Sequence, residues 1–174
     1  MSLIYITGIS GTGKTTVAHE LKKRGFEAYD ADGDGFNSWY DKKTGKKTTE
    51  SSHTNTNTLN WYKKHIWRTS RGKIEDLAIH AKNKNMFICG TPSNEKEIWD
   101  LFSKVICLTI DEQTLRHRIR IRSTNEFGKA PHELTEILKW YKLNQKLYKQ
   151  FGAYIVDATK PLNEVVDEIL EICM

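Results

Sequence analysis

A glycine-rich string close to the N-terminus constrains the fold of this chain more than any other feature. It reads Gly8-Ile-Ser-Gly-Thr-Gly-Lys14-Thr15 and matches the pattern G-x-x-x-x-G-K-[ST] in full. A short apolar run at residues 3–7 precedes it, and residues 14–24 have the spacing of apolar side chains that is typical of a helix. A strand, a glycine turn and a helix in direct succession predict an α/β fold with a parallel sheet.

The residue types in this string suit a phosphate chain. Glycines permit backbone angles that turn successive N–H groups inward, and the start of the next helix adds its positive dipole end. The ammonium group of Lys14 can reach the β- and γ-phosphates, and the Thr15 hydroxyl can bind Mg²⁺. We therefore expect ATP and Mg²⁺ as ligands, with these binding residues: Gly8, Ser10, Gly11, Thr12, Gly13, Lys14, Thr15 and Thr16.

The rest of the chain alternates between short apolar runs and segments with helical spacing. Further strands are expected at residues 26–30, 86–89, 105–110 and 154–157, and helices at 66–82, 98–102, 111–122, from 131 onward and at 162–173. This alternation predicts a three-layer fold, in which helices cover both faces of a five-stranded parallel sheet of strand order 2-3-1-4-5. Ligands of such sheets bind beyond the carboxyl ends of the strands.

Length and composition fit one soluble domain. The chain has 174 residues, of which 38% are hydrophobic, and its three cysteines are too few for a disulfide framework. We find neither the pattern of a secretory leader nor an apolar run long enough to span a membrane, and therefore expect a cytoplasmic protein without a membrane partner. The formal charge of +5 suits an anionic partner but does not separate nucleic acid from nucleotide.

With its early glycine string and its late arginine-rich stretch, the chain resembles P-loop kinases of small molecules and nucleotides, such as shikimate kinase, gluconate kinase and adenylate kinase. The likeness covers nearly the whole chain in layout, and it is specific at the glycine string, at Asp30 and Asp32, and at residues 118–122. It implies transfer of the γ-phosphoryl group of Mg-ATP to a small-molecule acceptor.

Asp30 and Asp32 follow the second expected strand. The resemblance to shikimate kinase implies that Asp30 lies near Mg²⁺ and that Asp32 orients the acceptor hydroxyl, although either carboxylate could take the metal. Two alternatives stay open. One is an acidic turn at the end of a strand. The other is a calcium-binding loop, because Asp30, Asp32, Asp34 and Gly35, with Asp41 at the twelfth position, partly match the EF-hand pattern.

A basic segment, residues 116–130, is the candidate lid. Its Arg118 and Arg122 match the R-x-x-x-R of adenylate kinase-like lids, and a spacing of four puts them on one face of a helix. The resemblance implies that Arg118 packs on adenine and that Arg122 contacts the phosphates, whose charge guanidinium groups stabilise. Together with Lys14 and Asp32, both count as candidate catalytic residues. The alternative is a solvated basic helix face.

The polar stretch at residues 36–62 interrupts the alternation of strands and helices. It is rich in Thr, Ser, Asn and Lys, yet it contains five aromatic residues, Phe36, Trp39, Tyr40, Trp61 and Tyr62. Disordered segments are normally poor in aromatic residues, and loops of this length in compact domains are often lids or binding loops. We therefore predict an acceptor-binding insertion over residues 36–71, with a disordered surface loop as the alternative.

The acceptor itself is not identified by the sequence. Where adenylate kinases have G-x-P-R, the chain has Gly90-Thr-Pro92-Ser93, which favours a hydroxyl acceptor over a nucleoside monophosphate. Arg68 and Arg71 are candidates for holding an anionic group of the acceptor, or ordinary surface residues. Because residues 61–68 interleave aromatic and basic side chains, a kinase of nucleosides, nucleotides or nucleic-acid ends is one alternative function. A non-catalytic ATP-dependent switch is the other.

Overall fold

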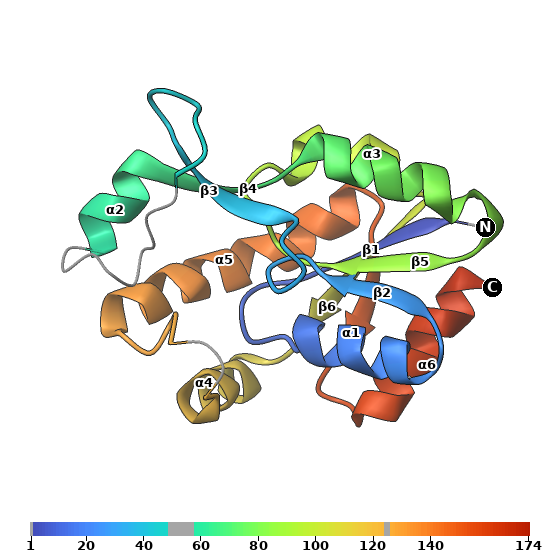
Figure 1. Ribbon diagram of the computed structural model, residues 1–174. Coiled ribbons are helices and arrows are strands. Elements are labelled where there is room, and N and C mark those ends of the chain that lie inside the picture. The colour runs from blue at the N-terminus through green and yellow to red at the C-terminus, as the bar shows by residue number, and fades with distance from the viewer. Residues whose placement is uncertain (1, 49–57, 124–125) are drawn as a thin grey trace.

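The fold is built on one parallel sheet, as Figure 1 shows for the computed structural model, which describes residues 2–48, 58–123 and 126–174. The sheet order is β2-β5-β1-β6-β7. These strands are β1 (Leu3–Thr7), β2 (Glu27–Asp30), β5 (Met86–Cys89), β6 (Lys104–Thr109) and β7 (Tyr154–Asp157). All neighbouring pairs run parallel. In order of appearance along the chain this is 2-3-1-4-5, so the predicted α/β fold and strand order are confirmed.

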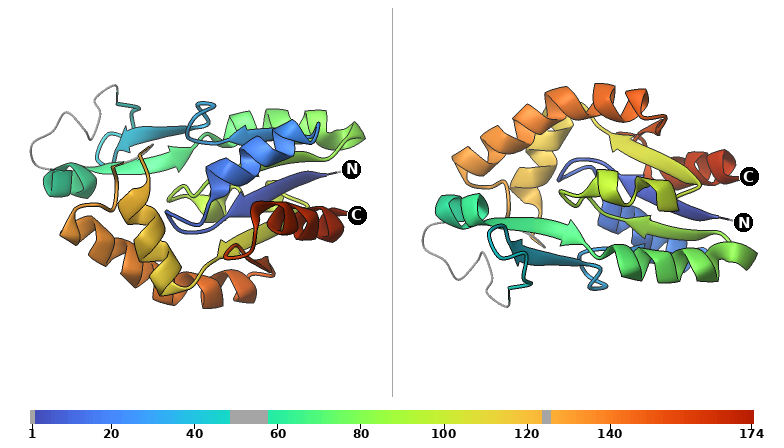
Figure 2. Two further views of the ribbon diagram at one scale, coloured as in Figure 1. Left: turned by 90° about the horizontal axis from the view of Figure 1, so that it is seen from below. Right: turned by 90° about the horizontal axis from the view of Figure 1, so that it is seen from above.

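Helices cover both faces of this sheet (Figures 1 and 2). One face packs against α1 (Lys14–Lys23) and α6 (Leu162–Cys173), and the other against α3 (Arg71–His80) and the C-terminal part of α5 (Pro131–Gln150). α4 (Glu112–Ile121) and the N-terminal end of α5 lie beyond the carboxyl ends of the strands (Figure 1). None of the helices in the described ranges is long and apolar enough to cross a membrane.

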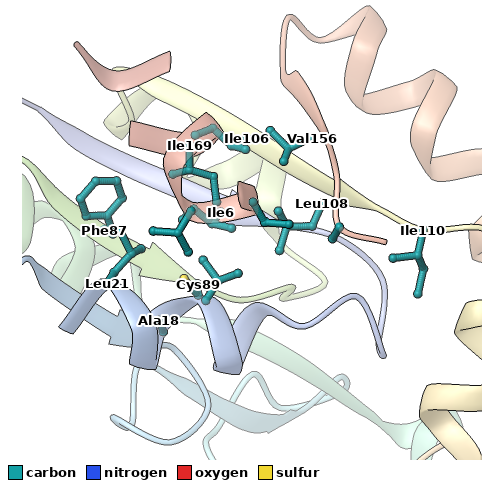
Figure 3. Packing of buried hydrophobic residues seen from close by; sticks show 14 of the residues in the cluster. Ile6, Ala18, Leu21, Phe87, Cys89, Ile106, Leu108, Ile110, Val156 and Ile169 are labelled. Atoms are coloured by element: carbon teal, nitrogen blue, oxygen red, sulfur yellow. The ribbon is translucent and has the colours of Figure 1, made fainter. Parts of the chain in front are cut away.

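The central strand β1 is buried on both of its faces, which explains its unbroken apolar run. Ile4 and Ile6 point toward α1 and α6, and Figure 3 shows Ile6 among Leu21, Phe87 and Ile169 of this layer. Because side chains alternate along a strand, the residues between them face the opposite layer. This packing fixes the carboxyl end of β1, and therefore the start of the glycine string.

The insertion, residues 36–71, differs from the sequence expectation. It contains a second, antiparallel sheet of β3 (Asn37–Asp41) and β4 (His65–Thr69), with α2 (Thr58–Lys64) before β4. The expected helix over 66–82 was therefore wrong in its first turn, because residues 65–69 pair with β3 and the side chain of Ser70 caps α3. Residues 49–57 of the polar stretch lie outside the described residues.

Most other boundaries agree with the sequence within about two residues, the usual uncertainty of such assignments. Asp111 caps α4, because its carboxylate accepts a hydrogen bond from the amide of Thr114 at 2.8 Å, and Pro131 stands in the first turn of α5. The expected helix at 98–102 is instead a pair of short 3-10 helices, η3 (Glu95–Glu97) and η4 (Trp99–Leu101). A further 3-10 turn, η2 (Ala81–Asn83), follows α3.

Candidate active site

The glycine string lies at the carboxyl end of the central strand and leads directly into α1. Gly8, Gly11 and Gly13 have φ angles of 143°, 95° and 98°, which L side chains rarely adopt. A Cβ atom at Gly8 would also lie 2.6 Å from the carbonyl oxygen of Leu108. Gly13 caps α1 without a side-chain hydrogen bond, so the first amides of this helix are left to other acceptors. This geometry is that of an anion-binding turn.

The ammonium group of Lys14 lies inside this turn. Its Nζ donates to the carbonyl oxygen of Gly8 at 2.6 Å and to that of Ile9 at 3.0 Å. Burial lowers the pKa of Lys14, while the negative charge of Asp32 is the largest effect that opposes this shift. Lys14 and Asp32 are therefore close enough to interact electrostatically, although they come from different strand ends.

The remaining residues of the string hold or surround this turn. Thr12 Oγ1 donates to the carbonyl oxygen of Ile9 at 2.9 Å. A Cβ atom added at Gly11 would lie only 2.9 Å from the side chain of Leu115 in α4. Thr15 and Thr16 lie exposed in the first turn of α1. Their hydroxyl groups are therefore accessible to a ligand at the glycine turn.

Asp30 and Asp34 shape the turn that follows β2. Asp30 Oδ1 accepts a hydrogen bond from the amide of Asp32 at 3.1 Å, and Asp34 Oδ2 accepts one from the amide of Asp30 at 2.9 Å. The calcium-loop alternative is wrong, because strands flank this turn where an EF-hand has helices. Within the described ranges, no three acidic, His or Cys side chains gather as a metal-binding group.

The side chain of Asp32 is oriented by hydrogen bonds from two residues of the insertion. Its Oδ1 accepts hydrogen bonds from Asn37 Nδ2 at 2.6 Å and from Trp67 Nε1 at 3.0 Å, which come from β3 and β4. The residue is exposed, and its Oδ2 has no hydrogen-bond partner among the residues that the structure describes. The carboxylate is thus fixed in orientation through one oxygen while the other faces solvent. This is the arrangement that an orienting base needs.

Arg118 and Arg122 both reach the glycine string from α4. Arg118 donates to the carbonyl oxygens of Thr12 at 3.4 Å and of Ala158, after β7, at 2.8 Å. Arg122 Nη1 donates to Ser10 Oγ at 3.0 Å, and its Nη2 donates to the carbonyl oxygen of Phe127. Burial lowers the pKa of Arg122. Its Nε is buried without a hydrogen-bond partner in the described part of the chain.

The alternative of a solvated basic helix face fits the other two arginines of α4, Arg116 and Arg120, better than it fits Arg118 and Arg122. Arg116 pairs with Glu112 one turn away at 2.8 Å, and Arg120 is exposed. The lid segment thus has a solvated side and a side that contacts the glycine string. Residues 124–125, within this segment, lie outside the described residues.

Glu95 is a buried carboxylate that the sequence analysis missed. Its Oε1 accepts hydrogen bonds from Tyr5 Oη at 2.7 Å and from Thr7 Oγ1 at 2.6 Å, and Tyr148 of α5 donates to Oε2. Burial raises the pKa of Glu95, and Lys14 is among the groups that oppose the shift. The partners are 53 to 90 residues away in sequence, so no local pattern could have found this cluster at the base of the glycine string.

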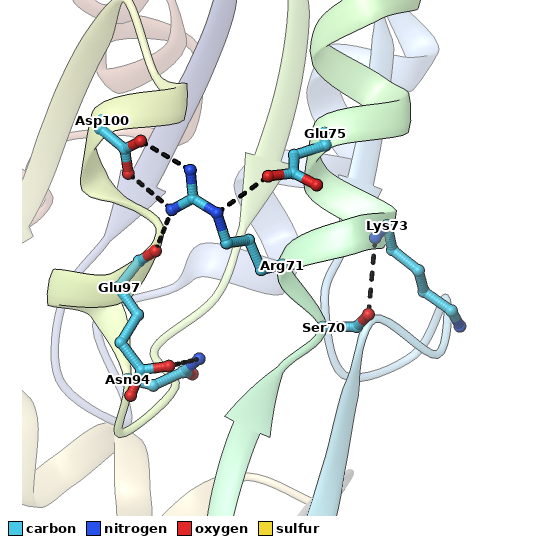
Figure 4. A network of polar contacts seen from close by, with 7 residues as sticks. All are labelled: Ser70, Arg71, Lys73, Glu75, Asn94, Glu97 and Asp100. Carbon is cyan, nitrogen blue, oxygen red and sulfur yellow. Dashed lines mark hydrogen bonds and ion pairs between the residues drawn. The ribbon is translucent and has the colours of Figure 1, made fainter.

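Arg68 and Arg71 both pair with acidic side chains of the same chain, and Figure 4 shows the contacts of Arg71. Arg71 binds both carboxylate oxygens of Asp100, at 2.8 and 2.7 Å, and also Glu75 at 2.9 Å, while Arg68 pairs with Glu97. The hydrogen bonds from Arg71 lower the pKa of Asp100. Both arginines therefore have internal ion pairs. This favours the alternative of ordinary surface residues over contact with an anionic group of the acceptor.

Comparison with known proteins identifies the group to which this geometry belongs. The sequence profile of the AAA domain family AAA_18 matches residues 4–139, which is most of the chain. No curated protein matches the sequence.

Solved structures with the same fold cover almost the full length. A shikimate kinase from Acinetobacter baumannii in complex with shikimate has 17% identity and a TM-score of 0.64, over 99% of this chain and 93% of that one. A deoxyadenosine kinase from M. mycoides with bound dATP has 21% identity and a TM-score of 0.55, over 99% of both chains. A gluconokinase from Sinorhizobium meliloti has 16% identity and a TM-score of 0.51, over 95% and 87%. The likeness establishes a P-loop kinase fold and confirms the resemblance drawn from the sequence.

Proposed function

The chain belongs to the AAA domain family, and on this premise we propose that it is an ATP-dependent phosphotransferase that phosphorylates a hydroxyl group of a small molecule. One observation carries the proposal. Lys14 lies inside the glycine turn beyond β1, while Asp32 follows β2 at the same edge of the sheet and is held through one oxygen, so that its other oxygen faces solvent. A phosphate-binding cation and an oriented carboxylate at the same edge of one sheet are what transfer to a hydroxyl group requires.

On the nucleotide side, the amides of the glycine turn and Lys14 bind the β- and γ-phosphates. Arg122, whose Nε is buried without a partner in the described residues, binds phosphoryl oxygens, and Arg118 lies beside the adenine. Thr15 and Asp30 would hold Mg²⁺, which neutralises charge on the phosphates. The small donor set fits this ion, because Mg²⁺ in kinases is bound by one or two protein ligands together with phosphates and waters.

On the acceptor side, Asp32 orients the hydroxyl group. The hydroxyl oxygen forms a bond to the γ-phosphorus, the bond from this phosphorus to the β–γ bridging oxygen breaks, and ADP leaves. The hydroxyl proton passes to Asp32 Oδ2 and then to solvent. Lys14 and Arg122 stabilise the charge on the transferring group, because their donors are fixed before the reaction begins.

The decisive experiment measures ADP release from ATP with a panel of hydroxylic compounds, using the protein and Lys14→Ala. An acceptor that raises ADP release well above that of the variant is the expected result. If ATP binds but no compound in the panel raises ADP release, the phosphotransferase proposal is wrong and the nucleotide-dependent switch takes its place.

A further inference from the structure

The insertion presents a row of aromatic rings that begins at Asp32. Trp67, which hydrogen-bonds Asp32, lies 5.0 Å from Trp39 between ring centroids; Trp39 lies 5.6 Å from Tyr62, and Tyr62 lies 6.0 Å from Phe127 of the lid segment. We call Trp39, Tyr62 and Trp67 the aromatic wall. It runs from the oriented carboxylate to the segment that carries Arg122.

The aromatic wall is supported from behind and partly open in front. Trp61 is only 2% exposed, stacks on His65 at 3.6 Å, and packs edge-on against Trp39 at 6.3 Å. Trp39, Tyr62 and Trp67 are each only half-buried. The buried ring of Trp61 holds the half-exposed rings in place and leaves part of their surface accessible. The binding of a flat ligand therefore costs little side-chain conformational entropy.

Four cations around the turn after β2 and the insertion already have partners within the described part of the chain. Lys22 pairs with Asp34 at 3.1 Å, and Lys73 donates to the carbonyl oxygen of Gly35 at 2.7 Å. Arg68 and Arg71 form the ion pairs described above. A carboxylate or phosphate on the acceptor would have to compete with an internal carboxylate for Lys22, Arg68 or Arg71. The surroundings of Asp32 therefore suit a neutral acceptor.

The polar side chains next to the aromatic wall are engaged as well. Asn37 Nδ2 is bound to Asp32 and its Oδ1 accepts from Thr69 Oγ1, while Asn94 bonds the backbone of Thr69 through both its amide atoms, at 2.9 and 3.1 Å. A polyol needs a partner for each hydroxyl group that it buries. Among the residues that the structure describes, the half-exposed rings of the aromatic wall and one oxygen of Asp32 lie open to a ligand, and they suit a flat ring that carries a reactive hydroxyl group.

From these contacts we propose that the acceptor is a neutral nucleoside, whose base stacks on the aromatic wall and whose primary hydroxyl group reaches Asp32. This inference rests on the proposed phosphotransferase function. The reaction is then ATP plus nucleoside to ADP plus nucleoside 5′-monophosphate. The 5′-oxygen gains the bond to phosphorus that the bridging oxygen loses, and Asp32 takes the proton.

Two separate measurements test it. Binding is followed without ATP, through quenching of tryptophan fluorescence by adenosine, guanosine, cytidine, uridine and their deoxy forms, with shikimate and gluconate as acidic polyol controls. Phosphorylation is followed as ADP release. We expect saturable binding of at least one nucleoside and none of the polyols. Binding of a nucleoside without ADP release would overturn the phosphotransferase proposal alone. ADP release with a polyol and with no nucleoside would overturn this inference alone.

Variants assign the binding to the aromatic wall. Trp39→Leu should weaken nucleoside binding about 10-fold because a stacking surface is lost, and Trp39→Phe should restore most of it. Trp140→Phe, on an exposed position of α5, is the matched control. The melting temperature of each variant shows whether it is folded. Unchanged nucleoside affinity in folded Trp39→Leu, or saturable binding only of oligonucleotides with a free 5′-end, would overturn the inference.

Discussion

The glycine turn and the aromatic wall form the two sides of the proposed site, yet they are built in different ways. The turn is made by consecutive residues, and its main contacts, such as Lys14 to Gly8, lie within six positions in sequence. The aromatic wall takes its rings from β3, α2 and β4, and it meets Asp32 across 35 residues. The glycine turn is therefore encoded locally, whereas the aromatic wall depends on tertiary packing. We expect substitutions in the aromatic wall to change the acceptor specificity, because they leave the glycine turn unaltered.

Lys14→Ala should have the largest effect and should act on the nucleotide side. Loss of the ammonium group removes a donor that faces the transferring phosphoryl group, so we expect kcat to fall about 1,000-fold. Steady-state kinetics and ATP titration measure this effect. Lys23→Ala, at the exposed end of α1, is the control. Equal activity of the two variants would contradict the assignment of the glycine turn.

Asp32→Asn should separate the two sides. The amide keeps the shape of the carboxylate but accepts no proton, so kcat should fall about 100-fold. ATP affinity should stay within about twofold, because Asp32 does not belong to the glycine turn. Asp34→Asn, in the same turn, controls for a change in loop structure. A large loss of ATP affinity in Asp32→Asn would show that the sides are not separable.

Glu95→Gln tests the tertiary cluster beneath the glycine turn. Because burial raises the pKa of Glu95 above 4.5, the folded state favours the protonated carboxyl, and this contribution to stability is lost as pH rises through the raised pKa. The glutamine variant cannot ionise, so its melting temperature relative to the wild type should rise over this window. The expected change is a few degrees, at about 2–4 °C per kcal/mol.

Thermal unfolding of both proteins over a pH series measures the effect. Glu136→Gln, an exposed position on α5, is the control and should leave the pH dependence unchanged. Melting curves of wild type and Glu95→Gln that stay parallel over the whole series would contradict a buried, titrating Glu95.

Arg71→Gln should have the smallest effect. Its ion pairs with Asp100 and Glu75 are exposed, and exposed pairs contribute little to stability. We expect a slight decrease in the melting temperature and a change of less than about twofold in the acceptor KM. Acceptor kinetics measure the second quantity. A strong increase of KM would return Arg71 to the acceptor site and would argue against a neutral acceptor.

The same contrast explains what could be read from the sequence. The glycine string and the five sheet strands depend on short-range patterns, and the strands and their order were predicted correctly. The secondary structure inside the insertion was not predicted, because β3 pairs with β4 across 24 or more residues and the run His65–Thr69 also continues the helical spacing of α3. The hydrogen bond from Trp67 to Asp32 depends on that pairing, so its position could not be foreseen either.

The bond between Tyr148 and Glu95 has a mechanical consequence. Tyr148 fixes the C-terminal part of α5 beneath the glycine turn, while the segment with Arg122 and Phe127 joins the other end of this 20-residue helix. A straight helix of this length is a rod of about 30 Å, so a tilt of about 5° at its anchored end moves the free end by roughly 2–3 Å. A slight repacking around the buried carboxyl group of Glu95 would therefore shift the far end of α5, next to the segment with Arg122 and Phe127, by about the width of an atom.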